Sequence, residues 1–367
     1  MIEKENFHTS QKEEIPSVFI GTGTFGTKWG PSWTMSKEEA FQIMDYACEN
    51  SILAFDSANV YNQGESQRWL GDYISSRRNH SRVYVSTKVG YRSKTDGLGN
   101  GGLSKRSIIS SAEDCLKALR VEQIDLLYLH VWDRITHIDE SLEAVVQLVE
   151  RGIIGGYGLC NVPAWYASEA CAKGQFNAGV PLKAVQLNYS LVERGIESEW
   201  PSFLATHDVN LVAWGVLSNG ILSGKYRIEG SQNKVTGDGR ITSNFVTGDV
   251  NIFSKRTSDV LKVLRDISIS TGYEMSEIAI AWAISKGFVS SVVLGVSSLG
   301  QLKRNLKALS LRLEKDVINI LDESYGYKVE YPYTFYEFDV QQLVHGETIA
   351  RRLVRENIYA FGGSEIK

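Results

Sequence analysis

The chain has 367 residues, of which 43% are hydrophobic and 22% are charged, the proportions of an ordinary globular protein rather than a disordered one. Its formal net charge is only -4. No block of about five or six like charges suggests a nucleic-acid-binding arm or an acidic tail. The composition therefore argues against a nucleic acid partner.

The first residues, MIEKENFHTSQKEE, lack the apolar stretch of a signal peptide. No later run approaches the roughly 18 apolar residues of a membrane span. We therefore expect a cytoplasmic protein with no membrane partner. The four cysteines, Cys48, Cys115, Cys160 and Cys171, show neither a CxxC pair nor a His at metal-ligand spacing, which predicts free thiols and no metal site.

Short β-branched runs alternate with amphipathic helical segments over residues 18–309, a pattern typical of βαβ units around a parallel sheet. Eight such runs are present, at 18–21, 54–56, 83–88, 126–130, 156–160, 184–188, 211–214 and 291–295. Eight is the strand number of a (β/α)8 barrel, which takes about 250 residues and tolerates insertions. The sequence thus predicts an α/β fold, a (β/α)8 TIM barrel.

Helix starts are marked by polar caps. Residues 36–50 begin with SKEE, a capping box, and Ser104 precedes a stretch with apolar residues at helical spacing. The stretch 215–254, after the seventh strand, is long and rich in Gly, Ser, Thr and Asn. Because barrels place their active-site loops at that end, we expect a mobile cofactor or substrate loop there.

An aromatic-rich tail follows the repeat. We expect a barrel at 1–324 and a C-terminal extension at 325–367 packed on it, with a helix near 347–357. One hypothesis is that the tail folds over the barrel mouth and narrows the choice of substrate. The alternative is a barrel flank or an oligomer contact, so a homo-oligomer is left open. The aromatic residues are Tyr325, Tyr327, Tyr331, Tyr333, Phe335, Tyr336 and Phe338.

One motif is misleading. GTGTFG, residues 21–26, matches the GxGxxG fingerprint of dinucleotide-binding Rossmann folds letter by letter. In that fold the last glycine opens a helix that holds the pyrophosphate, whereas here TKWGPSWTM follows and the helix starts ten residues later. GILSGKY likewise lacks the glycine spacing and the Ser or Thr of a phosphate loop. We reject both interpretations.

Ionisable residues end three neighbouring strands. Asp56 closes FDSA, Lys88 closes VYVSTK, His130 closes DLLYLH, and Tyr61 follows Asp56 in the adjoining loop. Each residue alone has an ordinary structural explanation, as a cap, a surface residue or a charge partner. Their joint position at the carboxyl ends of barrel strands, where barrel enzymes carry out catalysis, favours a catalytic site.

Carbonyl reduction explains this set of residues. It needs a proton donor beside the incoming hydride, and a tyrosine can supply the proton. A charge about 4 Å away at an effective dielectric near 20 contributes about 4 kcal/mol, so Lys88 is expected to lower the Tyr61 pKa towards neutrality. Asp56 would keep Lys88 charged, and His130 would either hydrogen-bond the substrate oxygen or relay a proton to Tyr61.

At these residues the chain resembles the aldo-keto reductases. FDSANVY with ESQRWLG is similar to the family's Asp and Tyr segment, VSTK to its Lys strand and DLLYLH to its His strand, over about residues 18–309. The motif style is closest to the bacterial and potassium-channel β-subunit branch. The resemblance implies NAD(P)H-dependent reduction of an aldehyde or ketone by the tetrad Asp56, Tyr61, Lys88 and His130.

The resemblance also implies a set of cofactor-binding residues. GLCN resembles a GxSN element with Cys160 in place of Ser, AWGVLSNGILSGKY resembles a pyrophosphate segment, and LGVSSLGQLKRN resembles an element around the adenosine phosphate. Trp214 would stack on the nicotinamide. Gly215 and Val216 stand where Ser and Pro are commoner. The implied residues are Gly23, Thr24, Phe25, Asp56, Asn161, Gln186, Trp214, Leu217, Gly220, Lys225, Ser297, Gln301, Arg304 and Asn305.

Arg304, where a Glu can occur, favours NADP as the cofactor, with NAD as the alternative. The partner is a small carbonyl or alcohol, and on family grounds a sugar-like carbonyl is the first choice. A cofactor-binding regulatory subunit of the same fold is the alternative function. A barrel hydrolase or isomerase would need paired carboxylates or a metal cluster at strand ends, and the sequence shows neither.

Overall fold

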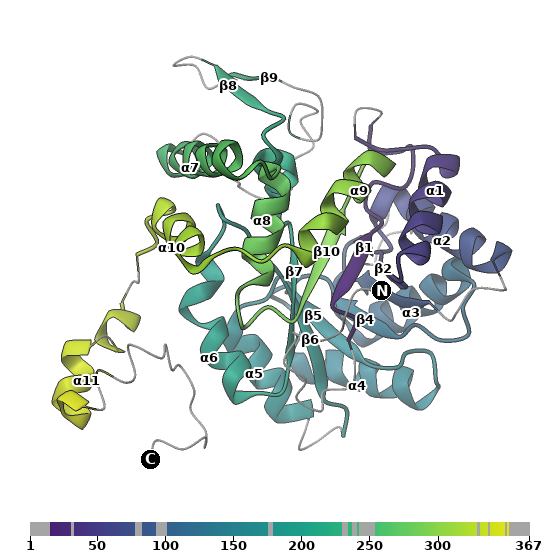
Figure 1. Cartoon of the computed structure of the whole chain (residues 1–367). Coiled ribbons are helices and arrows are strands. Elements are labelled where there is room, and N and C mark those ends of the chain that lie inside the picture. The colour runs from purple at the N-terminus through teal and green to yellow at the C-terminus, as the bar shows by residue number, and fades with distance from the viewer. Residues whose placement is uncertain are drawn as a thin grey trace.

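The computed structural model describes residues 15–30, 33–77, 83–92, 101–174, 179–229, 234–236, 241, 254–328, 331–336, 338–348 and 351. Eight parallel strands form a closed barrel in the order β1-β10-β7-β6-β5-β4-β3-β2. Helices surround this barrel (Figure 1). The predicted (β/α)8 TIM barrel is confirmed.

The barrel strands lie where the sequence pattern placed them. Three of them, at 18–21, 54–56 and 291–295, have the predicted bounds, and the ends of the other five shift by two residues at most. Such shifts are the usual uncertainty of strand ends read from sequence. The strands are β1 Val18–Gly21, β2 Ala54–Asp56, β3 Tyr84–Val89, β4 Leu126–Leu129, β5 Tyr157–Cys160, β6 Leu182–Asn188, β7 Asn210–Trp214 and β10 Ser291–Gly295.

Helices cover the outside of the strands. Ser36 caps α1 in a capping box with Glu39, and Ser104 caps α3, as the sequence predicts. None of the described helices is long and apolar enough to cross a membrane. The helices that follow the strands are α1 Lys37–Glu49, α2 Glu65–Ser76, α3 Lys105–Leu119, α4 Ile138–Glu150, α5 Ala164–Lys173, α6 Trp200–Thr206, α7 Lys255–Thr271, α8 Met275–Ile284, α9 Leu299–Lys307 and α10 Lys315–Ser324.

The segment after β7 contains more regular structure than the predicted loop. A 3-10 helix, η4 Ser218–Ser223, comes first, and β8 Arg227–Glu229 pairs antiparallel with β9 Lys234–Thr236. This two-stranded sheet projects at the top of Figure 1, beyond α7 and α8. Residues 1–14, 230–233, 237–240 and 242–253 lie outside the described residues.

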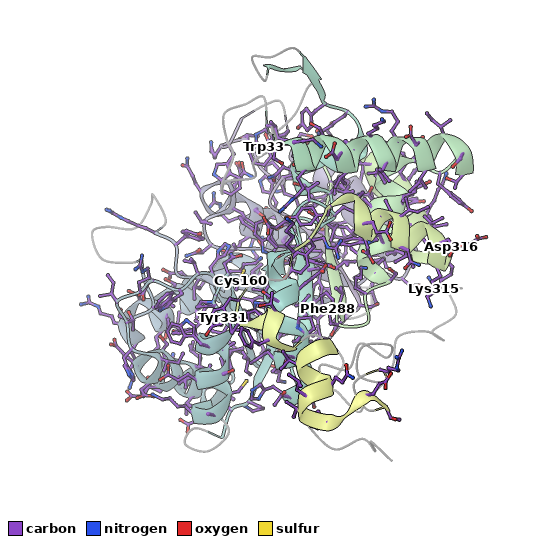
Figure 2. The ribbon with its side chains drawn as sticks, turned by 90° about the vertical axis from the view of Figure 1, so that its left-hand side faces the viewer. Trp33, Cys160, Phe288, Lys315, Asp316 and Tyr331 are labelled. Atoms are coloured by element: carbon purple, nitrogen blue, oxygen red, sulfur yellow. The ribbon has the colours of Figure 1, made fainter. Side chains whose placement is uncertain are left out.

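The C-terminal extension does not cover the barrel mouth, so the lid hypothesis is wrong for its described part. Tyr325 packs against the guanidinium groups of Arg194 and Arg256 on the flank. Tyr333 donates a hydrogen bond to Glu199, directly before α6, and Figure 2 shows Tyr331 well below Trp33, which lies on the loop at the carboxyl end of β1. A short helix, α11 Phe338–His345, stands apart in Figure 1. Most of the helix predicted near 347–357 lies outside the described residues.

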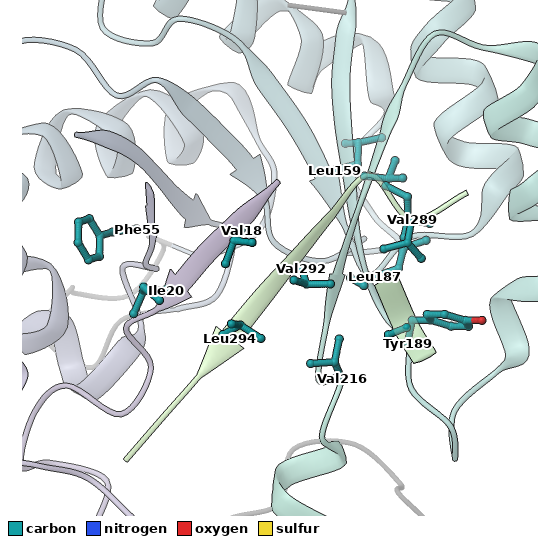
Figure 3. Close-up of a cluster of buried hydrophobic side chains, with 14 of the residues drawn as sticks. Val18, Ile20, Phe55, Leu159, Leu187, Tyr189, Val216, Val289, Val292 and Leu294 are labelled. Carbon is teal, nitrogen blue, oxygen red and sulfur yellow. The ribbon is translucent and has the colours of Figure 1, made fainter. Parts of the chain in front are cut away.

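Alternate residues of each strand enter two different cores. Phe19, Leu126, Tyr128 and Val293 fill the barrel interior. Their strand neighbours face outwards to the helices, and Figure 3 shows part of this outer layer with Val18, Ile20, Val292 and Leu294 labelled. Since side chains point to opposite faces of a strand in turn, each strand needs apolar residues on both sides. This alternation also decides which residues reach the mouth.

Candidate active site

The strand alternation directs the predicted catalytic residues into the barrel. Ala54 and Tyr128 belong to the interior core. Two residues further along, Asp56 and His130 point the same way, at the carboxyl ends of their strands. Gln186 follows Ala184 on β6 and Trp214 follows Val212 on β7 in the same manner. Because every second residue of a strand faces inwards, residues from distant parts of the chain meet at one end of the barrel.

The Lys88 ammonium contacts two of the residues predicted to be catalytic. Its Nζ donates a hydrogen bond to the Asp56 carboxylate, a second to the Ser57 carbonyl at 2.9 Å and a third to the Tyr61 hydroxyl at 3.3 Å. Lys88 and Asp56 are 1% and 2% exposed. The other oxygen of Asp56 accepts bonds from Ser86 Oγ at 2.8 Å and Gln186 Nε2 at 3.1 Å. Both buried charges therefore have their hydrogen-bonding capacity largely filled.

The pKa of Tyr61 lies above its ordinary value, so the predicted lowering towards neutrality is wrong. Burial raises the pKa, the Lys88 charge lowers it and Asp56 raises it again. Burial lowers the pKa of Lys88, but Asp56 and Tyr61 together bring it above its ordinary value. The charge on Lys88 is largely satisfied by Asp56, and it does not overcome the desolvation of the phenol. The Tyr61 phenol is therefore protonated at physiological pH.

His130 is uncharged at physiological pH. It is 7% exposed, and burial followed by the Lys88 charge lowers its pKa well below the usual value. Its ring meets Tyr61 edge-on with centroids 6.1 Å apart. Its Nδ1 is buried without a hydrogen-bond partner in the described structure. A neutral imidazole suits hydrogen bonding to a substrate oxygen better than a relay through imidazolium.

Asn161, Gln186 and Trp214 form a polar wall beside the tetrad. Asn161 Oδ1 accepts a bond from Trp214 Nε1 at 3.1 Å, and Asn161 Nδ2 donates to the backbone carbonyl of His130 at 3.1 Å. Asn161 has a φ of 51°, in the left-handed region that Asn adopts more readily than most residues.

Cys160 stands beside Asn161, at the position where the resemblance implies Ser. Burial raises the pKa of the Cys160 thiol to about 12, so this residue is a neutral thiol.

A cavity of about 1310 Å³ opens at this end of the barrel. It brings together most of the predicted residues. Lys88 lies behind its wall, and Phe25 is fully buried in the outer core, so the structure does not bring the Phe25 side chain to the cavity. The predicted residues that line it are Gly23, Thr24, Asp56, Tyr61, His130, Asn161, Gln186, Trp214, Leu217, Gly220, Lys225, Ser297, Gln301, Arg304 and Asn305.

The backbone after β7 forms a cradle that fits a dinucleotide. Ser218, Asn219 and Gly220 have φ values of 46°, 54° and 90°, and Gly215 has a φ of 73°. A Cβ on Gly220 would lie 2.6 Å from Lys225 Cε, and one on Gly215 would lie 2.6 Å from the Asn188 side chain. The amides of Ser218 and Gly220 donate to the carbonyls of Gly215 and Leu217, so this segment folds into tight turns at the cavity edge. Lys225, at the end of the segment, adds a cation suited to a pyrophosphate.

The far end of the cavity is formed by the start of α9. Ser298 caps this helix, and Gln301 Oε1 accepts bonds from the Ser297 amide at 2.9 Å and the Ser297 hydroxyl at 3.2 Å. Arg304 is exposed one turn further along. A helix N-terminus with hydroxyl groups and an arginine is suited to a phosphate group. The cavity thus holds amides at its catalytic end and anion-binding groups at its far end, as a nicotinamide dinucleotide requires.

The sequence did not single out the aromatic side of the cavity. Trp33, Trp29, Tyr61, His130 and Tyr91 form a row of rings, with neighbouring centroids 5.7, 5.7, 6.1 and 4.6 Å apart. All five residues line the cavity. The signal for the two tryptophans was the KWGPSW segment at 28–33, in the loop after the first strand, which was used only to reject a Rossmann fold.

Among the described residues, no group of three or more His, Cys, Asp or Glu could hold a metal ion. The four cysteines, all described, are free, as predicted.

The comparisons with known proteins agree with this geometry. The chain is 27% identical to an aryl-alcohol dehydrogenase of Pestalotiopsis microspora over 334 residues, 90% of this chain and 84% of the relative. It is 27% identical to norsolorinic acid reductase B of Aspergillus parasiticus, covering 88% of this chain and 84% of that protein. An aldo-keto reductase of Emericella nidulans is also 27% identical, with 87% and 80% covered.

The model of the Aldo/keto reductase family matches residues 17–325. This match covers the whole barrel, with the tetrad and the cradle after β7. The chain belongs to the Aldo/keto reductase family and is an oxidoreductase of carbonyl groups.

Proposed function

We propose that the protein reduces an aromatic aldehyde or ketone to the alcohol with NADPH, and that Tyr61 donates the proton. The observation that carries this proposal is the contact of Lys88 Nζ with both the Asp56 carboxylate and the Tyr61 hydroxyl, behind the wall of a large cavity. A general acid must lie within reach of the substrate oxygen, and the Tyr61 hydroxyl has this position at the cavity surface.

The chain's own residues would position the carbonyl and complete the protonation. Bound NADPH supplies the hydride, and Asn161 and Gln186 have the amide groups to hold its carboxamide. Tyr61 and His130 both offer hydrogen bonds to a carbonyl oxygen between them, which stabilises the negative charge that develops there. Tyr61 then transfers its proton to this oxygen, and the nearby Lys88 ammonium stabilises the phenolate that is left.

The pKa of Tyr61 favours reduction at neutral pH. Because its pKa is raised, Tyr61 is protonated before the reaction, which is the form that reduction needs. Alcohol oxidation needs the phenolate, which is a minor species at neutral pH. The site is therefore ready for reduction without any change in protonation.

The row of rings beside the tetrad supports an aromatic substrate. Trp29 and Tyr91 stand on either side of the Tyr61 and His130 pair, and a flat substrate ring gains most from aromatic walls. Relatives are named as aryl-alcohol dehydrogenase and norsolorinic acid reductase. We therefore favour an aromatic carbonyl over the sugar-like carbonyl considered first.

The cation at the far end of the cavity supports NADPH over NADH. Arg304 lies on α9 next to the cluster of Ser297 and Gln301, and no carboxylate pairs with it in the described part of the chain. An arginine suits the additional phosphate of NADPH, with which it can form bidentate hydrogen bonds. The named relatives have enzyme names, and we do not propose the regulatory-subunit alternative.

The test combines cofactor binding with a substrate panel. NADPH and NADH are titrated into purified protein, and turnover is measured with a benzaldehyde, a two-ring aromatic aldehyde, an aldose and a short aliphatic aldehyde. We expect tighter binding of NADPH and the highest kcat/KM for the aromatic aldehydes. Tyr61→Phe should lower kcat/KM by about 10²- to 10⁴-fold, the range for a general acid.

The matched control is Tyr46→Phe, which changes a tyrosine on α1 that does not line the cavity and should leave turnover unchanged. Equal turnover in Tyr61→Phe and wild type would refute the proton donor. A clear preference for the aldose would refute the aromatic substrate class.

A further inference from the structure

Asn62, the residue directly after Tyr61, has an unusual conformation and a buried side chain. It is 0% exposed and has φ and ψ values of 46° and 40°. This left-handed conformation costs a non-glycine residue free energy, although less for Asn than for most. Contacts of the Asn62 side chain must therefore offset the free energy that this backbone conformation costs.

The Asn62 side chain binds the backbone of the loop after β1. Its Nδ2 donates to the Gly23 carbonyl at 3.0 Å, and its Oδ1 accepts from the amides of Lys28 and Trp29 at 3.1 and 3.0 Å. Gly26 fits against it so closely that a Cβ there would lie 2.4 Å from Asn62 Cβ. One side chain thus fixes the loop on both sides of Gly26.

The loop held by Asn62 brings Trp29 against the catalytic tyrosine. The rings of Trp29 and Tyr61 meet edge-on with centroids 5.7 Å apart, and both line the cavity. Tyr61 is the chain neighbour of Asn62, while Trp29 is held through its own amide. The two ends of this ring contact are therefore tied to the same side chain.

We propose that Asn62 is a positioning residue that fixes Trp29 beside Tyr61, and that Trp29 so held is a wall that selects the carbonyl substrate. The substrate part of this inference rests on the proposed function. The placement of Trp29 by Asn62 stands independently of it.

Two other attachments of the loop indicate that loss of the Asn62 bonds would affect only the segment around Trp29. Glu65 Oε2 accepts bonds from the amide and the hydroxyl of Thr27 at 2.6 and 3.1 Å. Trp33, further along the loop, is 4% exposed. We therefore expect the loop to stay attached at Thr27 and at Trp33 when the Asn62 bonds are removed. Losing Asn62 should release the segment around Trp29 rather than unfold the barrel.

The test uses two substitutions at this position. Asn62→Gly removes the side chain while allowing the same backbone conformation, because glycine adopts a positive φ readily. Asn62→Asp keeps the oxygen that accepts from Lys28 and Trp29 but loses the donor to Gly23. We expect Asn62→Gly to lower kcat/KM for an aromatic aldehyde about tenfold, mainly through KM, because Trp29 is then no longer held in the position that contacts the substrate. Because its second oxygen faces the Gly23 carbonyl in a fully buried site, Asn62→Asp should be less stable than Asn62→Gly and should not restore kcat/KM.

Two further readouts distinguish positioning from a general structural role. NADPH affinity should fall by a smaller factor than kcat/KM in Asn62→Gly, because only the bond to the Gly23 carbonyl is lost on the cofactor side, while the cradle after β7 and the start of α9 keep their contacts. In a Trp29→Ala background, Asn62→Gly should have almost no further effect on kcat/KM, since residues that act through one another are not additive. Full additivity of the two substitutions would overturn the inference.

The accessibility of Trp29 tests the placement without any turnover. Acrylamide quenching of tryptophan emission is compared between each protein and its Trp29→Phe counterpart, so that the difference reports Trp29. Quenching of Trp29 should increase in Asn62→Gly and stay unchanged in the control Asn50→Gly, which alters the C-cap of α1. Unchanged quenching in Asn62→Gly would overturn the inference. Absence of turnover in wild type would instead refute the proposed function.

Discussion

The two ends of the cavity are built on different principles. At the catalytic end Asp56 and Lys88 are almost fully buried, and each of their polar groups has a partner at a defined position. Lys225 in the cradle after β7 and Arg304 at the far end are both exposed, and the cavity takes its shape there from the backbone turns of the cradle and the start of α9. Buried charges are strongly coupled to their partners, whereas exposed charges are screened by solvent. Substitutions should therefore have large effects at the first end and graded effects at the second.

The largest expected effect comes from breaking the buried ion pair. Lys88→Met leaves the Asp56 carboxylate buried without its cation, which should destabilise the fold by about 3–5 kcal/mol. It also removes the charge that stabilises the Tyr61 phenolate, so kcat/KM should fall by about 100-fold or more. Urea unfolding and steady-state kinetics measure the two losses separately.

The double substitution Asp56→Asn with Lys88→Met is the matched control. It removes both charges and keeps an oxygen to accept from Ser86 and Gln186, so most of the stability should return while activity stays low. If the double variant were as unstable as Lys88→Met, the ion pair would not be the cause, and the contrast between the two ends would be lost.

The pH dependence of reduction is the second prediction and concerns the catalytic end alone. Tyr61 must be protonated to act, and its pKa is raised above the ordinary value of about 10. His130 must be neutral, and its pKa is lowered well below about 6.5. We therefore expect kcat/KM to be constant from about pH 7 to about pH 9.5. A fall within this range that disappears in Tyr61→Phe would show that Lys88 outweighs burial after all.

The barrel, and the meeting of the four tetrad side chains at its mouth, could be predicted from sequence because both follow from local patterns. Strand alternation places Asp56, Lys88 and His130 on one side of their strands, and those positions are visible in three short segments. The pKa of Tyr61 could not be predicted in the same way. Its direction depends on how far burial outweighs the charge of Lys88, and burial is a property of the whole fold.

Long-range packing also escaped prediction. The aromatic tail had the composition of a pocket wall, yet Tyr325 packs against Arg194 and Arg256 on the flank. The true aromatic wall comes from Trp29 and Tyr91, which follow different strands and are brought together only by barrel closure. No local pattern distinguishes an aromatic residue on the flank from one at the mouth.

The third prediction concerns Trp214, which lines the cavity on the cofactor side. Trp214→Ala removes a ring from the cofactor side of the cavity and the Nε1 donor that holds Asn161. The loss of a stacking contact of about 1.4 kcal/mol should weaken NADPH binding about tenfold in a fluorescence titration. Trp214→Phe keeps a ring but not the donor. Equal affinities of Trp214→Phe and wild type would assign the effect to stacking, and equal affinities of all three would exclude Trp214 from the cofactor site.

The smallest effect is expected at Arg304, and it is the one that decides the cofactor. Exposed ion pairs contribute about 0.2–1 kcal/mol, so Arg304→Gln should weaken NADPH binding up to about fivefold and leave NADH binding unchanged. The loss should shrink as salt is added, because the interaction is exposed. Lys303→Gln, on the neighbouring position of α9 but not lining the cavity, is the control and should change neither affinity. Equal weakening of NADPH and NADH by Arg304→Gln would mean that Arg304 does not contact the additional phosphate. The far end of the cavity would then select its cofactor through backbone shape alone.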